Sequence, residues 1–178
     1  MRWLVDGYNV IRREPELARL ERESLEAGRR ALCRLLAEAA RASGDRFTVV
    51  FDGDRQGGAA AGGAGVQVVF SSARETADRV LARMATAGAA VVSSDREVRQ
   101  AAVRARAIAI TADQFLARVR GADRASPSGR DPDEGWDKDD EEPSPPRSKK
   151  GNPRRLSRKD RLAARALGRL GASSRRPS

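Results

Sequence analysis

The segment WLVDG, residues 3–7, places an aspartate and a glycine directly after a short apolar run. The segment FTVVFDG, residues 47–53, repeats this arrangement. Short apolar runs that alternate with segments of helical period predict the buried strands of a mostly parallel sheet. Five runs fit such strands, and they span residues 3–5, 47–51, 66–70, 89–92 and 107–110. The sequence therefore predicts an α/β fold built on five short strands.

Helices are predicted between these strands. Leucines at helical spacing between residues 17 and 36 predict a helix that is broken once, near Ser24. Three later segments show the capping-box pattern, in which a hydroxyl side chain and a Glu or Gln three residues on satisfy free backbone N–H groups. The three pairs are Ser72 with Glu75, Ser94 with Glu97, and Thr111 with Gln114. They predict helices that begin near residues 73, 95 and 112, respectively. The glycine-rich segment 53–65 has no such period and predicts a flexible loop.

The composition changes sharply near Gly121. Residues 1–120 contain 20 arginines, 15 acidic residues and nearly every large apolar side chain, so they can form a core. Residues 131–142 hold eight acidic residues and one lysine, whereas residues 147–178 hold twelve Lys or Arg and one aspartate. Such blocks repel themselves and bury little. We predict a domain over residues 1–121 and a disordered low-complexity tail over 122–178, with one basic amphipathic helix at 158–170.

The residues that are missing restrict the chemistry. The chain has no histidine and a single cysteine, Cys33, which excludes Ser-His-Asp triads, imidazole bases and His- or Cys-ligated zinc. The first lysine is Lys138, so the domain has no Schiff-base or phosphate-loop lysine. No apolar stretch approaches the roughly 20 residues that span a membrane, and residues 1–9 lack a signal peptide's apolar run, so we expect a cytoplasmic protein. Carboxylate chemistry remains, acting directly or through Mg²⁺ or Mn²⁺.

Acidic residues follow the predicted strands or lie close behind them: Asp6, Asp52, Glu75, Asp78 and Asp95. The carboxyl ends of parallel strands meet at one edge of a sheet, so these side chains should converge there. Crowded carboxylates raise one another's pKa unless a cation neutralises them. Mg²⁺ takes one or two carboxylates, keeps several waters and binds substrate phosphates, which suits such an open site. We predict a divalent-metal site at this edge.

Each of these residues also has an ordinary structural explanation. Asp-Gly after a strand is common in turns, which accounts for Asp6 and Asp52 without a metal. Glu75 fits the capping box, and Asp95 would favour the dipole of the helix that follows it. Asp78 would then lie on a solvated helix face. These explanations are weaker jointly than singly, because they require five unrelated coincidences at one edge.

Four ordered motifs carry a family resemblance. VDGYNVI at 5–11, VVFDG at 49–53, ETAD at 75–78 and VVSSDREV at 91–98 resemble the YacP-like branch of the NYN domain family, which are PIN-like nucleases. The resemblance covers residues 2 to about 120 and leaves the tail outside. It implies a three-layer α/β/α sandwich with a central, mainly parallel five-stranded sheet. It also implies a metal-dependent endoribonuclease, and some members of this branch cut messenger RNA in association with the ribosome.

Matched motif by motif, the resemblance implies a catalytic set of Asp6, Asp52, Asp78 and Asp95. Of these, Asp6, Asp78 and Asp95 would bind Mg²⁺ or Mn²⁺, and Glu75 is a weaker candidate ligand. Asn9 would support the site by orienting a ligand or a water, although an Asx turn explains it equally well. The loop after Asp52 departs from the family pattern, since its alanines and glycines offer few groups to read a substrate.

The net charge of +10 favours a polyanionic partner, and RNA is the one predicted. Candidate phosphate contacts are Arg55, Arg74, Arg79, Arg96, Arg154, Arg155, Arg158 and Lys159. The alternative is a PIN-like module that binds RNA or the ribosome without cutting, but such a module would gain from losing acids beside phosphates. For the basic helix the alternative partner is a membrane surface, which its lack of aromatics disfavours. A phosphatase of the DxD type is suggested by Asp52-Gly53-Asp54. Such enzymes also need a downstream lysine, and the sequence has none before Lys138. The sequence indicates no oligomeric state.

Overall fold

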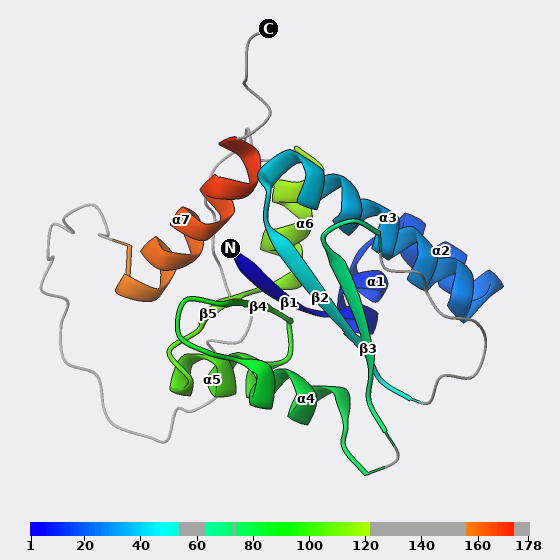
Figure 1. Cartoon of the computed structure of the whole chain (residues 1–178), viewed down its shortest axis with the longest axis horizontal. Helices are drawn as coiled ribbons and strands as arrows, with labels where there is room; N and C mark the ends of the chain where they lie inside the picture. Colours follow the sequence, from blue (N-terminus) through cyan, green and yellow to red (C-terminus); the bar gives the residue numbers. More distant parts are fainter. Residues whose placement is uncertain (54–62, 73, 122–155, 173–178) are drawn as a thin grey trace, which may run out of the picture.

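Five parallel strands form the central sheet of the computed structural model, which describes residues 1–53, 63–72, 74–121 and 156–172. The strand order is β3-β2-β1-β4-β5, and every neighbouring pair is parallel (Figure 1). The strands are β1 (Arg2–Asp6), β2 (Arg46–Phe51), β3 (Val66–Phe70), β4 (Ala90–Val92) and β5 (Ile108–Ile110). Each overlaps the run predicted for it, so the predicted sheet is confirmed.

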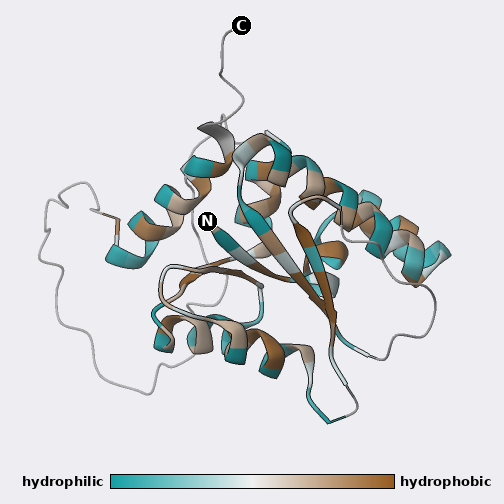
Figure 2. Ribbon diagram, viewed as in Figure 1, coloured by the Kyte–Doolittle hydropathy of each residue, from teal (hydrophilic) through white to brown (hydrophobic). Residues whose placement is uncertain are grey.

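Helices cover both faces of the sheet and make the predicted three-layer sandwich. One face carries α1 (Gly7–Arg13), α2 (Pro15–Glu23), α3 (Leu25–Ser43), α6 (Ala112–Val119) and α7 (Arg158–Ala172), and the other carries α4 (Ala77–Met84) and α5 (Arg96–Arg104). Successive residues of a strand point to opposite faces. Trp3 and Val5 therefore pack in the core on the α1 side of the sheet, while Leu4 packs in the core on the α4 side. Figure 2 shows the resulting apolar strands between helices with polar outer faces.

Two of the predicted helix boundaries are confirmed. Ser24 separates α2 from α3, and its hydroxyl accepts a hydrogen bond from the backbone N–H of Glu26 at the start of α3. Thr111 and Gln114 form the reciprocal capping box at the start of α6. Both cases depend only on neighbours in the chain, which is why the sequence pattern predicts them.

The helix predicted after β3 is present, but its predicted start near residue 73 is wrong. Ser72 and Glu75 pair through their backbones in a short antiparallel bridge, with N···O distances of 3.2 and 3.1 Å. The helix α4 begins at Ala77, and Thr76 caps it by accepting a hydrogen bond from the backbone N–H of Arg79. The capping-box pattern at residues 72–75 is therefore accidental, and Glu75 lies outside the helix.

Residues 7–13 carry no predicted helix, yet they form α1. Asp6 is its N-cap, and Oδ1 of Asp6 accepts a hydrogen bond from the backbone N–H of Asn9 at 3.2 Å. Val10 and Ile11, one turn further on, are completely buried. The Asp-Gly pair that resembles a turn is thus the start of a helix. The Asp6 carboxylate is hydrogen-bonded to the backbone of that helix.

The basic helix predicted at residues 158–170 is present as α7, and it packs on the rest of the protein. It lies against α3, α6 and β5 and buries Ala163, Ala166, Leu167 and Leu170. Arg118 of α6 donates hydrogen bonds to the backbone oxygens of Leu167 and Gly168, at 2.9 and 3.2 Å. Most of the loop at 53–65 and all of the acidic segment at 131–142 lie outside the described residues. No helix in the described ranges has the length and apolar composition needed to cross a membrane.

Candidate active site

Four of the predicted acidic residues lie at the carboxyl edge of the sheet. Asp6 ends β1, Asp52 directly follows β2, and Asp95 lies between β4 and α5. Asp78 lies in the first turn of α4. Because β2, β1 and β4 are neighbours in the sheet, the turns that carry these residues are neighbours too. The topology thus brings together side chains that are far apart in the sequence, as the parallel sheet predicts.

Asp6 is the most constrained of these carboxylates. Its Oδ2 accepts a hydrogen bond from the hydroxyl of Ser93 at 2.8 Å, and its Oδ1 accepts one from the backbone of Asn9. Burial raises the pKa of Asp6 above its ordinary value, and these two hydrogen bonds oppose the rise. The negative charges of Asp78 and Asp95 raise the same pKa further.

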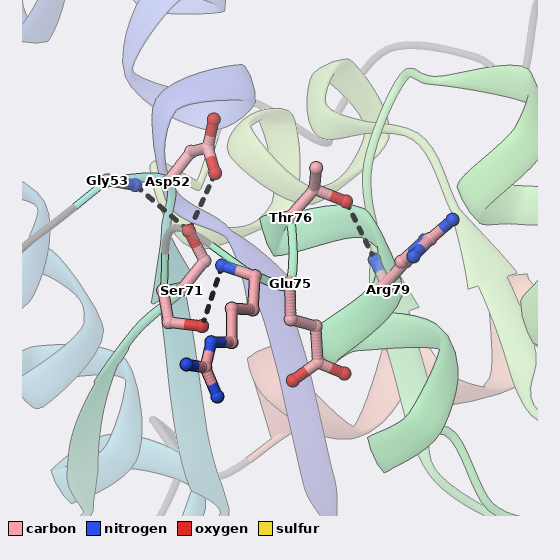
Figure 3. A pocket seen from close by; sticks show the side chains of 8 residues that line it. Asp52, Gly53, Ser71, Glu75, Thr76 and Arg79 are labelled. Carbon is pink, nitrogen blue, oxygen red and sulfur yellow. Dashed lines mark hydrogen bonds between the residues drawn. The ribbon is translucent and has the colours of Figure 1, made fainter.

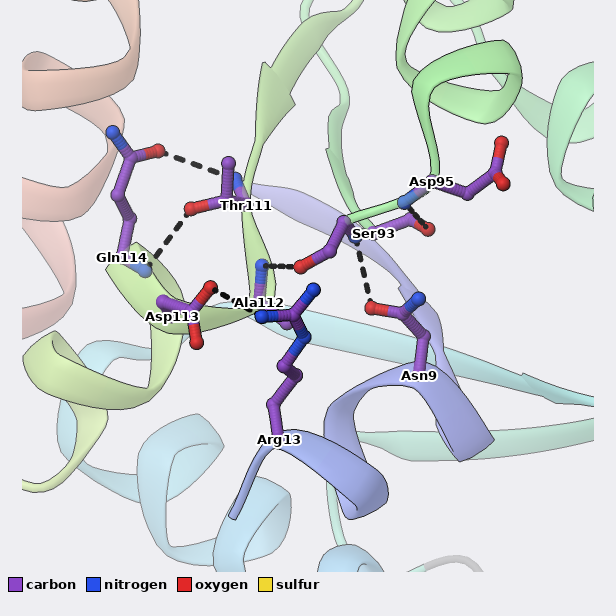
Figure 4. Close-up of polar contacts among 9 residues, drawn as sticks. Asn9, Arg13, Ser93, Asp95, Thr111, Ala112, Asp113 and Gln114 are labelled. Carbon is purple, nitrogen blue, oxygen red and sulfur yellow. Dashed lines mark hydrogen bonds and ion pairs between the residues drawn. The ribbon is translucent and has the colours of Figure 1, made fainter. Parts of the chain in front are cut away.

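Two polar side chains connect the ends of β1 and β4. Ser93 is completely buried, and its Oγ accepts a hydrogen bond from the backbone N–H of Asp95 at 3.0 Å while it donates to Asp6. The Oδ1 of Asn9 accepts a hydrogen bond from the backbone N–H of Ser94 at 2.8 Å (Figure 4). These bonds set the position of Asp6 relative to Asp95. Asn9 therefore supports the candidate site through the backbone.

Asp95 caps α5, which corrects the prediction that Ser94 does so. Its Oδ1 accepts hydrogen bonds from the backbone N–H groups of Glu97 and Val98, at 2.7 and 3.0 Å. The hydroxyl of Ser94 instead accepts a bond from the backbone of Ala112 at 3.3 Å. Since one oxygen of Asp95 takes both cap bonds, Oδ2 has no hydrogen bond to a described residue and can serve another ligand.

Asp78 has the least support from its neighbours. The side chain is exposed on α4 and has no hydrogen bond or ion pair to another described residue. Partial burial raises the pKa of Asp78, and the charges of Asp95, Asp52 and Glu97 raise it further. Its carboxylate therefore gains little from the protein and is repelled by other acids, which is the situation that a bound cation would relieve.

Asp52 differs from the other three aspartates. The hydroxyl of Ser71 donates to its Oδ1 at 2.6 Å, and the backbone N–H of Ala77 donates to the same oxygen at 3.3 Å. The hydrogen bond from Ser71 is the main reason that the pKa of Asp52 is lowered. Ser71 also accepts a bond from the backbone of Gly53 at 2.9 Å (Figure 3). Asp52 is thus stable as an anion without a metal.

Glu75 is paired with a cation from its own protein. Both of its oxygens accept hydrogen bonds from Arg83 of α4, from Nε at 3.0 Å and from Nη2 at 3.1 Å. This bidentate contact lowers the pKa of Glu75. The sequence places Glu75 three residues before Asp78, but the structure directs its carboxylate to Arg83.

The donor chemistry of the edge fits a divalent cation. Within the described residues, no three Asp, Glu, His or Cys side chains lie close enough together to hold a metal ion as they stand. Asp6, Asp78 and Asp95 nevertheless place carboxylate oxygens at this edge from three separate segments, and burial and neighbouring carboxylates raise the pKa of Asp6 and Asp78. Hard oxygen ligands under mutual repulsion suit Mg²⁺ or Mn²⁺.

The predicted phosphate contacts fall into three groups. Arg74 and Arg79 line a cavity of about 400 Å³ beside Asp52. Arg96 is exposed next to Asp95, and two further cations are exposed in the first turn of α7, Arg158 and Lys159. The remaining three lie outside the described residues, namely Arg55, Arg154 and Arg155.

Sequence reasoning missed the two buried serines, Ser71 and Ser93. Each directly follows a strand, and each donates to the aspartate that ends the neighbouring strand, Asp52 and Asp6 respectively. A serine after an apolar run is the available signal in the sequence. It does not identify the acceptor, because the strands that pair are separated by up to 87 positions in the chain.

A second missed feature is the buried guanidinium of Arg29. It is 4% exposed, and its Nε donates to the hydroxyl of Tyr8 at 2.9 Å. The same group lies 5.1 to 5.6 Å from the ring centroids of Tyr8, Phe51 and Phe70. Arg12 also lies over the Tyr8 ring, at 5.4 Å. The Tyr8 ring is therefore packed against the guanidinium groups of Arg12 and Arg29.

Replacing Ser93 with alanine should lower the free energy of unfolding by about 1–3 kcal/mol, because a buried carboxylate oxygen of Asp6 and the N–H of Asp95 would each lose a partner. Urea unfolding of the two proteins measures the difference. Ser94→Ala is the matched control, and it should change the free energy by less than about 1 kcal/mol because its one bond is long. Equal losses in both variants would contradict a special role for Ser93.

The sheet order and the helical layers are those expected of a PIN-like domain. The chain matches the YacP-like NYN domain over residues 3–162 and belongs to this family. YacP of Bacillus subtilis (strain 168) is 37% identical over 86 residues, which are 47% of this chain and 51% of that protein. The match thus spans about half the length of this relative.

Two crystal structures of Rae1 (YacP) from Bacillus subtilis resemble the fold. One, a mutant, is 32% identical with a TM-score of 0.57, and the similarity covers 69% of this chain and 77% of that one. The other is 30% identical with a TM-score of 0.55, covering 70% and 76% respectively. The family and fold expected from the four sequence motifs are confirmed.

Proposed function

We propose that the protein is a metal-dependent endoribonuclease that hydrolyses phosphodiester bonds in RNA. The observation that carries the proposal is the placement of Asp6, Asp78 and Asp95 at the carboxyl edge of the sheet, at the ends of neighbouring strands and in the first turn of α4. Membership of a nuclease-type family supports the same conclusion. In this proposal the three aspartates hold Mg²⁺ or Mn²⁺, and Asp52 lies beside them as a fixed anion.

In this proposal, two of the three aspartates are held in place by hydrogen bonds and the third is not. Ser93 and the backbone of Asn9 hold Asp6 in place, and the α5 cap holds Asp95. Asp78 has no such support and is free to adjust to a ligand. When bound, the divalent ion would activate water and stabilise charge on the phosphoryl oxygens. Without histidine, cleavage by an imidazole acid–base pair acting on the 2′-hydroxyl is excluded, so we expect 5′-phosphate products.

Arginines and lysine would hold the RNA. We propose backbone contacts from Arg74, Arg79 and Arg96 near the acids, where guanidinium groups can bind phosphates bidentately. The five remaining candidates, Arg55, Arg154, Arg155, Arg158 and Lys159, would extend the basic surface. Messenger RNA on the ribosome is the substrate suggested by other members of the family. The apolar face of α7 is already buried in the protein, which supports RNA over a membrane as the partner of this helix.

A binding module without catalysis is the second candidate. The absence of a three-acid metal cluster within the described residues favours it. The acids themselves disfavour it, because burial and neighbouring carboxylates raise the pKa of Asp6 and Asp78, and further negative charge from bound phosphates would add to this repulsion. Nothing in a pure binder would compensate for this repulsion.

Cleavage of labelled RNA by the purified full chain distinguishes the two. The reactions contain Mg²⁺, Mn²⁺ or a chelator, each with and without ribosomes. We expect cleavage with either metal and none with chelator. Cutting that persists in chelator would refute the metal mechanism, and RNA binding without cutting in every reaction would establish the binding module.

Stability against pH provides a second test that does not depend on activity. A group whose pKa is raised by folding contributes its full stability below its unfolded pKa and loses it as the pH rises through the folded pKa. In chelator, the protein should therefore become less stable relative to Asp78→Asn as the pH rises from roughly 4 to 7. Mg²⁺ should reverse this difference, because it binds the folded protein through Asp78.

Thermal unfolding at each pH, with and without Mg²⁺, measures the effect. Glu38→Gln is the matched control, since it removes a charge from an exposed position on α3 that is not among the groups acting on Asp78. A Mg²⁺-induced rise in Tm that is the same in Asp78→Asn as in the unsubstituted protein would exclude Asp78 as a ligand.

A further inference from the structure

The cavity beside Asp52 is lined by polar and charged residues and by no aromatic ring. Its volume of about 400 Å³ is within the range of sites that hold small ligands, roughly 300–1,000 Å³. No aromatic side chain lines it. Figure 3 shows Asp52 and Ser71 on one side, Thr76 and Arg79 on the other, and Glu75 between them. Such a lining suits a charged, hydroxyl-rich ligand and offers a nucleobase no aromatic ring to stack on.

The hydroxyl groups of the cavity have hydrogens to donate. The Oγ of Ser72 accepts a hydrogen bond from the backbone N–H of Arg74 at 3.3 Å, and the Oγ1 of Thr76 accepts one from the backbone of Arg79 at 3.4 Å. Each hydroxyl acts only as an acceptor in these contacts, so its own hydrogen is available to a ligand oxygen. Both side chains are exposed, so a ligand can reach them.

The two arginines of the lining are its candidate contacts for an anion. Glu75 would repel a phosphate, but Arg83 neutralises it through both oxygens. The Oδ1 of Asp52 accepts bonds from Ser71 and from the backbone of Ala77. Arg74 and Arg79 are exposed and have no ion pair with a described residue. Two arginines without an ion pair to a described residue therefore line one cavity, and a guanidinium group can bind phosphate oxygens through paired hydrogen bonds.

The cavity adjoins the group of acids. Asp52 lines it, and the Oδ1 of Asp52 accepts a hydrogen bond from the backbone N–H of Ala77, the residue before Asp78. We propose that this cavity binds the sugar-phosphate unit next to the phosphate that is cut, through Arg74, Arg79 and the two hydroxyls. The proposal rests on the proposed RNA cleavage for its biological role. It adds that the protein reads the backbone at this position and not the base.

Equilibrium binding in chelator tests the proposal without requiring catalysis. The full chain is compared with the double variant Arg74→Ala/Arg79→Ala by fluorescence anisotropy. A second double variant, Arg22→Ala/Arg104→Ala, removes the same charge from exposed positions on α2 and at the end of α5. Three short oligomers of equal length serve as probes: RNA, an abasic ribose-phosphate chain, and RNA with uncharged methylphosphonate linkages.

We expect the first double variant to bind RNA and the abasic chain about 10-fold more weakly, and to bind the methylphosphonate probe as the unsubstituted protein does. The control variant should lose less than about 3-fold on every probe. An equal loss of affinity in both variants would show that the arginines act only through the general surface charge, and that the cavity is not a specific site. A loss seen only with probes that carry bases would make it a base pocket, and no loss would remove it from the RNA path.

The outcome is separable from that of the proposed function. If no RNA is cut with metal but the binding pattern appears, the subsite stands and the nuclease proposal fails. If RNA is cut and the first double variant binds normally, the nuclease stands and the subsite fails.

Discussion

Replacing Asp6 with asparagine should lower the rate of RNA cleavage by about 100-fold or more while leaving the protein folded. Asparagine keeps an oxygen that can accept the cap bond from the backbone of Asn9, so α1 retains its start. It removes the negative charge that a cation would bind. Single-turnover cleavage with saturating Mg²⁺ measures the rate, and thermal unfolding confirms the fold.

Glu75→Gln is the matched comparison, because it makes the same chemical change at an acid that the structure assigns to Arg83. We expect cleavage to fall by less than about 3-fold, since Glu75 does not reach the other carboxylates. If the two substitutions reduce the rate equally, the division of the acids into a metal group and a paired residue is wrong. If neither reduces it, the acidic edge is not the site of catalysis.

Gly7→Ala should destabilise the protein by about 1–3 kcal/mol and also reduce cleavage. Gly7 is buried at the first position of α1, and a Cβ there would overlap the ring of Phe51. The Phe51 ring is completely buried and packs against Tyr8 and Phe70, so it has no free space to move into. The strain would instead displace α1, which begins beside Asp6, or the end of β2, which precedes Asp52.

Gly168→Ala is the control for this prediction. Gly168 lies in α7, where an added Cβ meets nothing within 4 Å. Alanine should therefore stabilise the helix by about 0.5–1 kcal/mol, because it lowers the entropy of the unfolded chain without a clash. The free energy of unfolding, measured with urea, should fall for Gly7→Ala and rise for Gly168→Ala. A Gly7→Ala protein as stable as the parent would show that β1 and β2 need no close approach at this edge.

The predictability of the fold follows from the parallel sheet. Its strands are buried on both faces, and therefore they appear in the sequence as uninterrupted apolar runs such as residues 47–51. Local capping patterns behave in the same way when donor and acceptor are three residues apart, as at Thr111 and Gln114. The capping pattern at Ser72 and Glu75 fails because a backbone bridge competes with it, and a bridge cannot be read from side-chain spacing.

The candidate site was predictable only in outline. A parallel sheet places all strand ends at one edge, so Asp6, Asp52 and Asp95 could be grouped from sequence alone. Their individual states could not be assigned. The pKa of Asp52 is lowered by Ser71, whereas burial raises that of Asp6, and both effects arise from contacts across strands.

The sequence by itself determined the sheet, the helix breaks at capping residues and the family, because these depend on the order of apolar runs and on motifs of a few adjacent residues. Only the tertiary structure decided that Glu75 binds Arg83, that Ser93 holds Asp6, and that α7 packs on α3, α6 and β5. These contacts join residues from different elements, and the energy of a hydrogen bond or an apolar contact depends on distance in space, which spacing along the chain does not specify.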